Sequence, residues 1–345
     1  MNAPDENLIH ADLIAPVPTI PELRFRRFRG EADFPALLRV YNAAWLADHE
    51  ERVGTLEWIK TEYHPVPNFD PYQDALLAEV NGEIVAVGQS RWFVERNNPR
   101  VILDTSGAIH PDWRRKGIGR ALLHLNEAHL RETAERLQQK YPRPGWVYAF
   151  FSNANNFMPG SHALLKSEGY QPIRLGDIMV RPNLDDIPDL PLPAGLEVRP
   201  ARPEDYRQIW DASQEAFRDH WAYTDPTEED YQNWLTAPDF QPELWQVAWD
   251  GDQVAGMIMN FIMPLDNETF QRKRGWTEGI CVRRPWRRMG LARALLARSM
   301  KMHRDLGMTE TALGVDVENP NGAFKLYSSM GYQTIRIHTT YSKAL

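Results

Sequence analysis

The sequence predicts an α/β fold built twice along the chain, each time as a mixed, partly parallel twisted sheet flanked by helices. A basic, glycine-bearing run occurs at Arg114–Leu123 and again at Arg287–Leu296. Its key glycines, Gly117 and Gly290, lie 173 positions apart, about half of the 345 residues. A repeat of that length indicates two domains in tandem rather than a solenoid. In both halves a hairpin signal precedes the run, and a strand–helix–strand pattern surrounds it.

Each half opens with a helix and a hairpin. The helices are expected at Pro35–Trp45 and Arg207–Phe217. Asn81-Gly82 and Asp250-Gly251 each separate two apolar runs, and these dipeptides are strong signals of a β-hairpin. The expected hairpin strands are Ala75–Val80 with Ile84–Ser90, and Leu244–Trp249 with Val254–Phe261.

A crossover follows each hairpin. One strand precedes the glycine run, an amphipathic helix follows it, and a further strand comes next. A short helix then ends at Gly-Tyr, where glycine is a usual C-cap. The crossover strands are expected at Val101–Ile109, Trp146–Phe151, Trp276–Val282 and Thr311–Val317. Because a helical crossover joins parallel strands, we expect a partly parallel sheet.

Local composition sets the expected domain boundaries. Residues 1–21 are acidic and proline-dotted and lack the basic-then-apolar order of a signal peptide, so we expect a flexible segment there. Residues 181–195 contain four prolines and are expected to form a linker. The first domain is therefore expected at residues 22–180 and the second at residues 196–345.

Overall composition excludes several classes of protein. Hydrophobic residues make up 43% and charged residues 25%, which is typical of soluble globular proteins. No apolar run approaches the roughly 18 residues of a membrane helix. Cys281 is the single cysteine, which fits a reducing cytoplasm, and the ten histidines show no metal-ligand spacing. With a net charge of −8, we expect a cytoplasmic protein without a metal, nucleic-acid or membrane partner, and its oligomeric state stays open.

The glycine run has the features of a phosphate cradle. Backbone N–H groups at a helix start bind phosphate oxygens, and the helix dipole favours negative charge. Gly117, Gly119 and Gly290 permit close approach of the backbone, and Ala292 is a small residue at the fourth such position. Arginines ahead of the glycines can pair with phosphate. A tight turn with a basic rim does not explain why the loop recurs in the same context.

With these loops the chain resembles a tandem GCN5-related N-acetyltransferase (GNAT). The family motif Q/R-x-x-G-x-G/A is matched by Arg114–Gly119 and by Arg287–Ala292. The resemblance implies that acetyl-CoA is the cofactor, with its pyrophosphate in the loops and its pantetheine beside the preceding strand. The cofactor-binding residues expected in the second half are Ile280, Val282, Arg287, Arg288, Met289, Gly290, Leu291, Ala292, Arg293 and Asn319. Those expected in the first half are Arg114, Arg115, Lys116, Gly117, Ile118 and Gly119.

A later family motif, N-P-x-G-A-x-x-L-Y-x-x-x-G-F/Y, is matched only in the second half, by Asn319–Tyr332. The resemblance implies that Tyr327 protonates the leaving thiolate; the alternative is an aromatic ring packed under the helix. In the first half Leu165 lies opposite Tyr327 and has no proton to give. We therefore expect a catalytic second domain. The first domain is expected to be non-catalytic, and either binds CoA without turnover or only shapes the substrate cleft.

Glu278 is the candidate general base, because it lies on the strand before the second loop, where the family often places one. The usual position is two residues earlier, where this chain has Trp276. The alternative is a salt-bridged glutamate at the end of the strand. An offset of 173 makes Thr105 the counterpart of Glu278 in the first half.

Asp219, His220 and Trp221 are the candidate residues for binding the acceptor. They lie between the first helix and first strand of the second half, and acidic and aromatic groups suit a cationic amine. The alternative is a solvated helix with a few packed aromatics. Cys281 on the same strand as Glu278 is expected to be a buried structural cysteine rather than an acyl carrier.

Together these features predict an acetyl-CoA-dependent N-acetyltransferase. The acetyl group would pass to a primary amine of a small molecule by direct attack in a ternary complex. Two alternatives remain open: a non-catalytic acyl-CoA-binding or regulatory protein, and an acetyltransferase that acts on protein amines.

Overall fold

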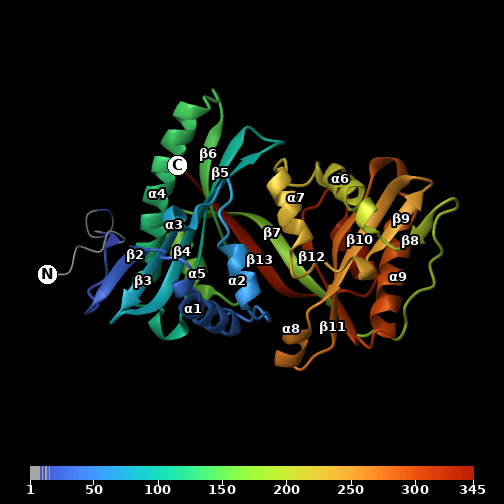
Figure 1. Ribbon diagram of the computed structural model, residues 1–345, viewed down its shortest axis with the longest axis horizontal. Coiled ribbons are helices and arrows are strands. Elements are labelled where there is room, and N and C mark those ends of the chain that lie inside the picture. Colours follow the sequence, from blue (N-terminus) through green and yellow to red (C-terminus); the bar gives the residue numbers. More distant parts are fainter. Residues whose placement is uncertain (1–7, 10, 12–13, 15) are drawn as a thin grey trace. The chain divides into compact units, whose positions relative to one another are not determined.

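The computed structural model of the protein describes residues 8, 9, 11, 14 and 16–345 (Figure 1). The chain divides into two compact units. The first contains Met1–Arg174 and Thr339–Leu345, and the second contains Leu175–His338. Each unit holds a mixed sheet with helices packed on both faces, so the predicted fold class is confirmed.

The sheet of the first unit is antiparallel except for its β5–β6 pair, which is parallel. Its strands are β1 (Leu8–Ile9), β2 (Leu23–Arg27), β3 (Ala75–Val80), β4 (Glu83–Glu95), β5 (Arg100–Ile109) and β6 (Val147–Asn155). Its helices are α1 (Phe34–Ala47), α2 (Leu56–Glu62), α3 (Pro71–Asp74), α4 (Ile118–Lys140) and α5 (Pro159–Ser167). The predicted hairpin is β3–β4, and the helix expected after the glycine run is α4.

Two helices cover opposite faces of this sheet. Leu77 and Val87 pack under α1, whereas Leu76 and Ala86 pack under α4. Successive side chains of a strand point to opposite faces, so this alternation is what a sheet buried on both sides requires. No helix among the described residues is both long and apolar enough to cross a bilayer.

The second unit repeats this plan. Its strands are β7 (Gln171–Arg181), β8 (Glu197–Arg199), β9 (Gln246–Asp250), β10 (Gln253–Ile262), β11 (Arg274–Val282), β12 (Glu310–Asp316) and β13 (Gln333–Ala344). Its helices are α6 (Tyr206–Phe217), α7 (Glu228–Leu235), α8 (Pro264–Thr269), α9 (Leu291–Asp305) and α10 (Ala323–Ser329). The β11–β12 pair is parallel, as β5–β6 is in the first unit. One face packs against α6 and the other against α9 and α10.

The division of the chain differs from the expected domain boundaries at the last strand of each half. In β7, residues 175–181 belong to the second unit, where they pair with β12. In β13, residues 339–344 belong to the first unit, together with Leu345, and Tyr341 is buried in its core. Two continuous ranges, 22–180 and 196–345, cannot describe this division, because each unit receives the end of a strand that follows the other half in the sequence.

Two further segments were expected to be irregular. Residues 182–196 contain no helix or strand, but Arg181 belongs to β7, and its guanidinium donates to the Met330 carbonyl at 2.6 Å. The segment expected to be flexible, residues 1–21, lies partly outside the described residues. Of its described part, Leu8–Ile9 form β1 and pair with β2.

Candidate functional site

The second glycine loop connects β11 to α9. Arg288 has φ of +63° and Gly290 has φ of +86°, so two residues of this short loop take the left-handed conformation. Such a conformation turns neighbouring N–H groups toward a common point and makes an anion-binding concavity, here at a helix start. A Cβ added at Gly290 would meet no described atom within 4 Å, so there is open space above the loop.

Beside this loop the sheet opens between two parallel strands. β11 and β12 are paired only from Arg274 to Trp276, and both strands continue beyond that point. β11 also carries a β-bulge at Gly279, which has φ of +58°, so that one residue lies outside the ladder with β10. The bulge and the opening leave backbone of β11 free to face a ligand.

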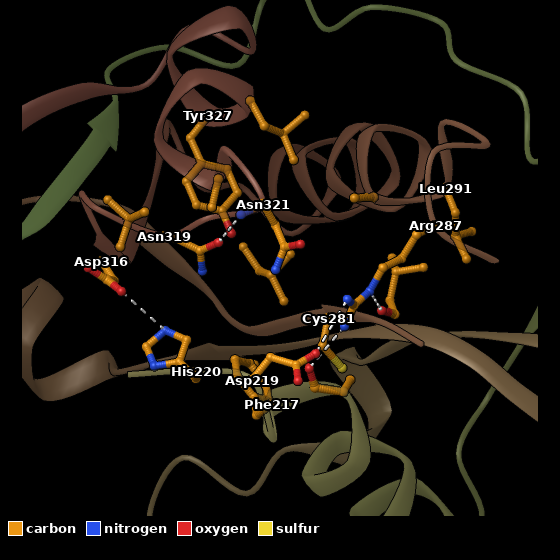
Figure 2. Close-up of a pocket in the computed structure, with 18 of the residues that line it drawn as sticks. Phe217, Asp219, His220, Cys281, Arg287, Leu291, Asp316, Asn319, Asn321 and Tyr327 are labelled. Atoms are coloured by element: carbon orange, nitrogen blue, oxygen red, sulfur yellow. Dashed lines mark hydrogen bonds and ion pairs between the residues drawn. The ribbon is translucent and has the colours of Figure 1, made fainter. Parts of the chain in front are cut away.

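A cavity of about 680 Å³ occupies this opening in the second unit (Figure 2). Its walls come from the end of α6, the bulged part of β11, the glycine loop, the end of β12 and the start of α10. The residues expected at the site that line it are Asp219, His220, Glu278, Ile280, Val282, Arg287, Arg288, Gly290, Leu291, Ala292, Arg293, Asn319 and Tyr327. Met289 and Trp221 are not among the described residues that line this cavity.

The cavity is lined from both faces of the sheet. Tyr327 packs with the core under α9 and α10, together with Val315. Glu278 lies on the other face, because its Oε1 is 3.4 Å from the position of a Cβ on Gly314. Figure 2 shows Tyr327 reaching the cavity from one side and His220 lying on the opposite side. Two reactants can therefore approach one another from opposite faces.

Glu278 spans the gap between the separated strands. Its Oε1 accepts the N–H of Gly314 at 2.7 Å. Burial raises the pKa of this carboxyl from 4.5 to about 7, although the Gly314 N–H lowers it. A carboxyl that titrates near neutral pH suits a general base.

Tyr327 is buried at the same cavity, with its ring 6.2 Å from that of Tyr332 in an edge-on arrangement. Burial, and then the charge of Glu278, raise the pKa of the phenol well above 10. The phenol therefore keeps its proton at neutral pH and can donate it. Burial also raises the pKa of Cys281 to about 12, which keeps this thiol protonated.

Arg287 connects the glycine loop to the end of α6. It donates to the carbonyls of Val282 at 3.0 Å and Ala216 at 3.2 Å, and its Nη1 lies 3.7 Å from Asp219 Oδ2. Arg284 donates to the same Asp219 carboxylate at 2.6 Å. The role of Asp219 in acceptor binding stays a prediction, and two arginines already face its carboxylate.

The first unit contains the same connection, in which Arg114 donates to both Asp48 oxygens at 2.7 Å. Its glycine loop also has the same shape, with φ of +62° at Arg115 and +89° at Gly117. However, Pro18 covers this loop, since a Cβ on Gly117 would lie 3.0 Å from Pro18 Cβ. Ile118 is buried in a core that includes Val17 and Ile20 of the N-terminal segment.

The first unit also differs at the positions that correspond to Glu278 and Tyr327. Its β4–β5 pair has no bulge, and Ser106 pairs with Gln89 where Glu278 pairs with Met259. Ser106, not Thr105, is therefore the counterpart of Glu278, because the bulge shifts the numerical offset by one. Leu165 is a core residue. Asp104 is half-buried, and desolvation raises the pKa of its carboxyl to about 6.

Several lining residues were not singled out from the sequence. Phe217, Gly279, Gly314 and Asp316 line the cavity. Gly279 directly follows Glu278, and a glycine inside a strand is a known signal of a bulge. Asp316 ends a strand, but nothing in the sequence says which face it occupies.

The chain matches known proteins in both halves. Residues 206–332 match the acetyltransferase (GNAT) family, and residues 71–172 match an acetyltransferase (GNAT) domain. The mycothiol acetyltransferase of Thermobifida fusca is 30% identical over 256 residues, which cover 68% of this chain and 73% of that protein. The mycothiol acetyltransferase of Geodermatophilus obscurus is 28% identical over 239 residues, which cover 68% of this chain and 72% of that protein.

Solved structures agree in fold. A GCN5-related N-acetyltransferase from Sphaerobacter thermophilus has a TM-score of 0.67 at 25% identity, over 94% of this chain and 97% of that one. A tandem GNAT protein from the clavulanic acid biosynthesis pathway reaches a TM-score of 0.62 at 15% identity, over 94% and 98%. The chain belongs to the GNAT family, as an acetyl-CoA-dependent acetyltransferase with two GNAT domains in tandem.

Proposed function

We propose that the second unit transfers an acetyl group from acetyl-CoA to a primary amine of a small molecule, by direct attack in a ternary complex. The observation that carries this proposal is the meeting of Glu278 and Tyr327 in one cavity, from opposite faces of the sheet. One group takes a proton and the other gives one, which are the two proton transfers that amide formation from a thioester requires.

The donor end of the cavity fits a CoA pyrophosphate. Arg288, Gly290 and Arg293 line it at the start of α9, where backbone N–H groups and the helix dipole favour phosphate. Acetyl-CoA supplies the activated acetyl group as a thioester. A developing oxyanion would lie against the bulged backbone at Gly279 and would accept hydrogen bonds from its N–H groups.

On the side of the cavity where the acceptor would bind, Glu278 removes a proton from it. An alkylammonium with a pKa near about 10.4 is almost wholly charged at neutral pH and cannot attack until it loses that proton. A carboxyl titrating at about 7 is largely ionised above that pH and can accept it. Tyr327 then protonates the departing thiolate, whose thiol has an ordinary pKa near about 8.5.

The named relatives favour a small acceptor. The mycothiol acetyltransferases are 26–30% identical to this chain over about two thirds to three quarters of its length. They therefore support a small-molecule acceptor over a protein amine.

Release of free thiol from acetyl-CoA in the presence of small amines tests the proposal. We expect Tyr327→Phe to lower kcat by roughly 10²- to 10⁴-fold, the usual contribution of a general acid, and to leave CoA affinity unchanged. Tyr206→Phe, in α6 and outside the cavity, is the matched control. Tight CoA binding without turnover of any amine would instead favour a binding or regulatory protein, and acetylation of intact proteins alone would favour a protein substrate.

A further inference from the structure

We propose that Asp316, with His220 facing it, forms the subsite that positions the acceptor. The acceptor class that fits is a small amine with a second hydrogen-bond donor, an ammonium or a hydroxyl, a few bonds from the reacting nitrogen. This inference rests on the proposed function, because it places the acceptor on the α6 face of the cavity.

The direction of the β12 side chains puts Asp316 on the acceptor face. Leu313 and Val315 pack in the core under α9 and α10, so Gly314 and Asp316 point to the opposite face. That face also holds the Glu278 carboxylate, which is bonded to Gly314 N–H. Gly314 and Asp316 lie two residues apart on β12, roughly 6.6 Å along the strand, so Asp316 is the next residue of this strand on the same face after the one that holds the Glu278 carboxylate.

A matched turn in the first unit shows that this position does not need a charge for folding. Asp316 Oδ1 accepts the N–H of Glu318 at 3.2 Å, and in the first unit Asn155 Oδ1 accepts the N–H of Phe157 at 2.8 Å. Both residues end the strand that is parallel to the one before the glycine loop. An asparagine therefore makes the same turn as the aspartate.

The rest of the Asn155 side chain is held inside the first unit by hydrogen bonds. Its amide donates to the Asp48 carbonyl at 3.1 Å and to the Glu50 carboxylate at 2.5 Å, and the residue is 1% exposed. In the second unit Asp316 lines the cavity instead, with its Oδ2 3.9 Å from His220 Nε2 (Figure 2). Where the first unit has a buried, hydrogen-bonded amide, the second unit thus has a carboxylate and an imidazole that line the cavity.

The charges along the cavity divide it into two ends. Arg288 and Arg293 line the loop end, where phosphates would lie. The carboxylate of Asp219 faces the cations of Arg284 and Arg287, as Asp48 faces Arg114 in the first unit. On the acceptor face the carboxyl groups of Glu278 and Asp316 line the cavity, and negative charge there attracts a cationic amine.

Asp316→Asn tests the subsite, because Asn155 shows that the variant keeps the turn. The probes are 1,4-diaminobutane, 4-aminobutan-1-ol and pentylamine, each with acetyl-CoA. We expect wild type to use the first two with a lower KM than pentylamine. The variant should raise the KM for those two by roughly ten- to hundredfold, the range for losing a hydrogen bond to a charged group. kcat, pentylamine turnover and CoA affinity should change little.

Asp305→Asn, which removes an exposed carboxylate at the end of α9 beside Arg304, should leave every parameter unchanged. Three results would overturn the subsite: equal use of all probes by wild type, an unchanged preference in Asp316→Asn, or acetylation of none of the three. Because Tyr327→Phe is measured on the same amines, loss of the preference can be told apart from loss of the chemistry. Turnover that depends on Tyr327 but not on Asp316 would leave the proposed function standing and remove this inference.

Discussion

Burial acts on Glu278 and Tyr327 in the same direction but with opposite consequences for their protons. The raised pKa of the carboxyl brings its titration to about 7, so that it can exchange a proton at physiological pH. The raised pKa of the phenol keeps its proton in place until a strong base, such as a thiolate, forms beside it. A base and an acid thus share one cavity without neutralising one another.

The pH dependence of turnover should report Glu278. A base must be ionised, so we expect kcat/KM to rise with pH through an apparent pKa of about 7 and then level off. Glu278→Gln should lower activity by roughly 10²- to 10⁴-fold and remove this limb of the profile. Rate profiles between pH 5.5 and 9 check both effects; a limb that persists in the variant would assign the base to another group.

The sequence alone was informative about some site residues and silent about others. Tyr327 could be named because its motif spans a whole helix, and the chain brings it to the same cavity as Glu278. Asp316 could not be named, because the face that a strand residue occupies depends on register and on the helices packed against it. Register also explains why the assignment of Thr105 as the counterpart of Glu278 was wrong. The bulge adds one residue to β11, so the residues before it correspond to positions one further along β5 than the offset of 173 gives.

At the scale of elements, the contact between α9 and β11 includes a buried histidine. His303 is fully buried against Gly275, where a Cβ would lie 2.6 Å from the imidazole ring. Burial lowers the pKa of His303 to about 4. The folded chain therefore holds this ring neutral, whereas the unfolded chain protonates it below a pH of about 6.5.

This difference makes stability depend on pH in a predictable direction. Because the folded pKa is depressed, stability is fully present above about pH 6.5 and is lost as pH falls toward 4. From pH 7 to pH 5 we expect a loss of about 2 kcal/mol from this residue. His303→Leu places in α9 the residue type that Leu130 provides in α4. In urea unfolding this variant should lose about 2 kcal/mol less between pH 7 and pH 5 than the wild type, so the slope of its unfolding free energy against pH is smaller. An identical slope in the variant would contradict the assignment.

The order of elements was the most predictable level of the structure. Hairpin dipeptides, alternating apolar residues and the glycine run mark β3–β4, β9–β10, α4 and α9 close to where they lie. The exchange of β7 and β13 between units was not predictable, and Gly279 signals a bulge in β11 without saying how the bulge shifts the pairing with β10. Both depend on which strands pair, and pairing is decided by contacts far apart in the sequence.

At the scale of the whole molecule, duplication has produced two units with the same loop and different surroundings. Arg115 and Arg288 take the same left-handed conformation in corresponding loops. Space above the loop is open at Gly290, whereas Pro18 lies over Gly117. The second unit also has the bulged strand, Glu278 and Tyr327. We therefore propose that the chain has one CoA site and one active centre, both in the second of its two similar units.

Calorimetric titration of the full chain with CoA tests this claim most directly, using Arg115→Glu and Arg288→Glu as a matched pair. Each variant reverses one charge at the same place in one loop. We expect one CoA per chain in the wild type, unchanged stoichiometry and affinity in Arg115→Glu, and binding weakened by roughly tenfold or more in Arg288→Glu. Two CoA molecules per chain, or binding that is weakened only by Arg115→Glu, would contradict it.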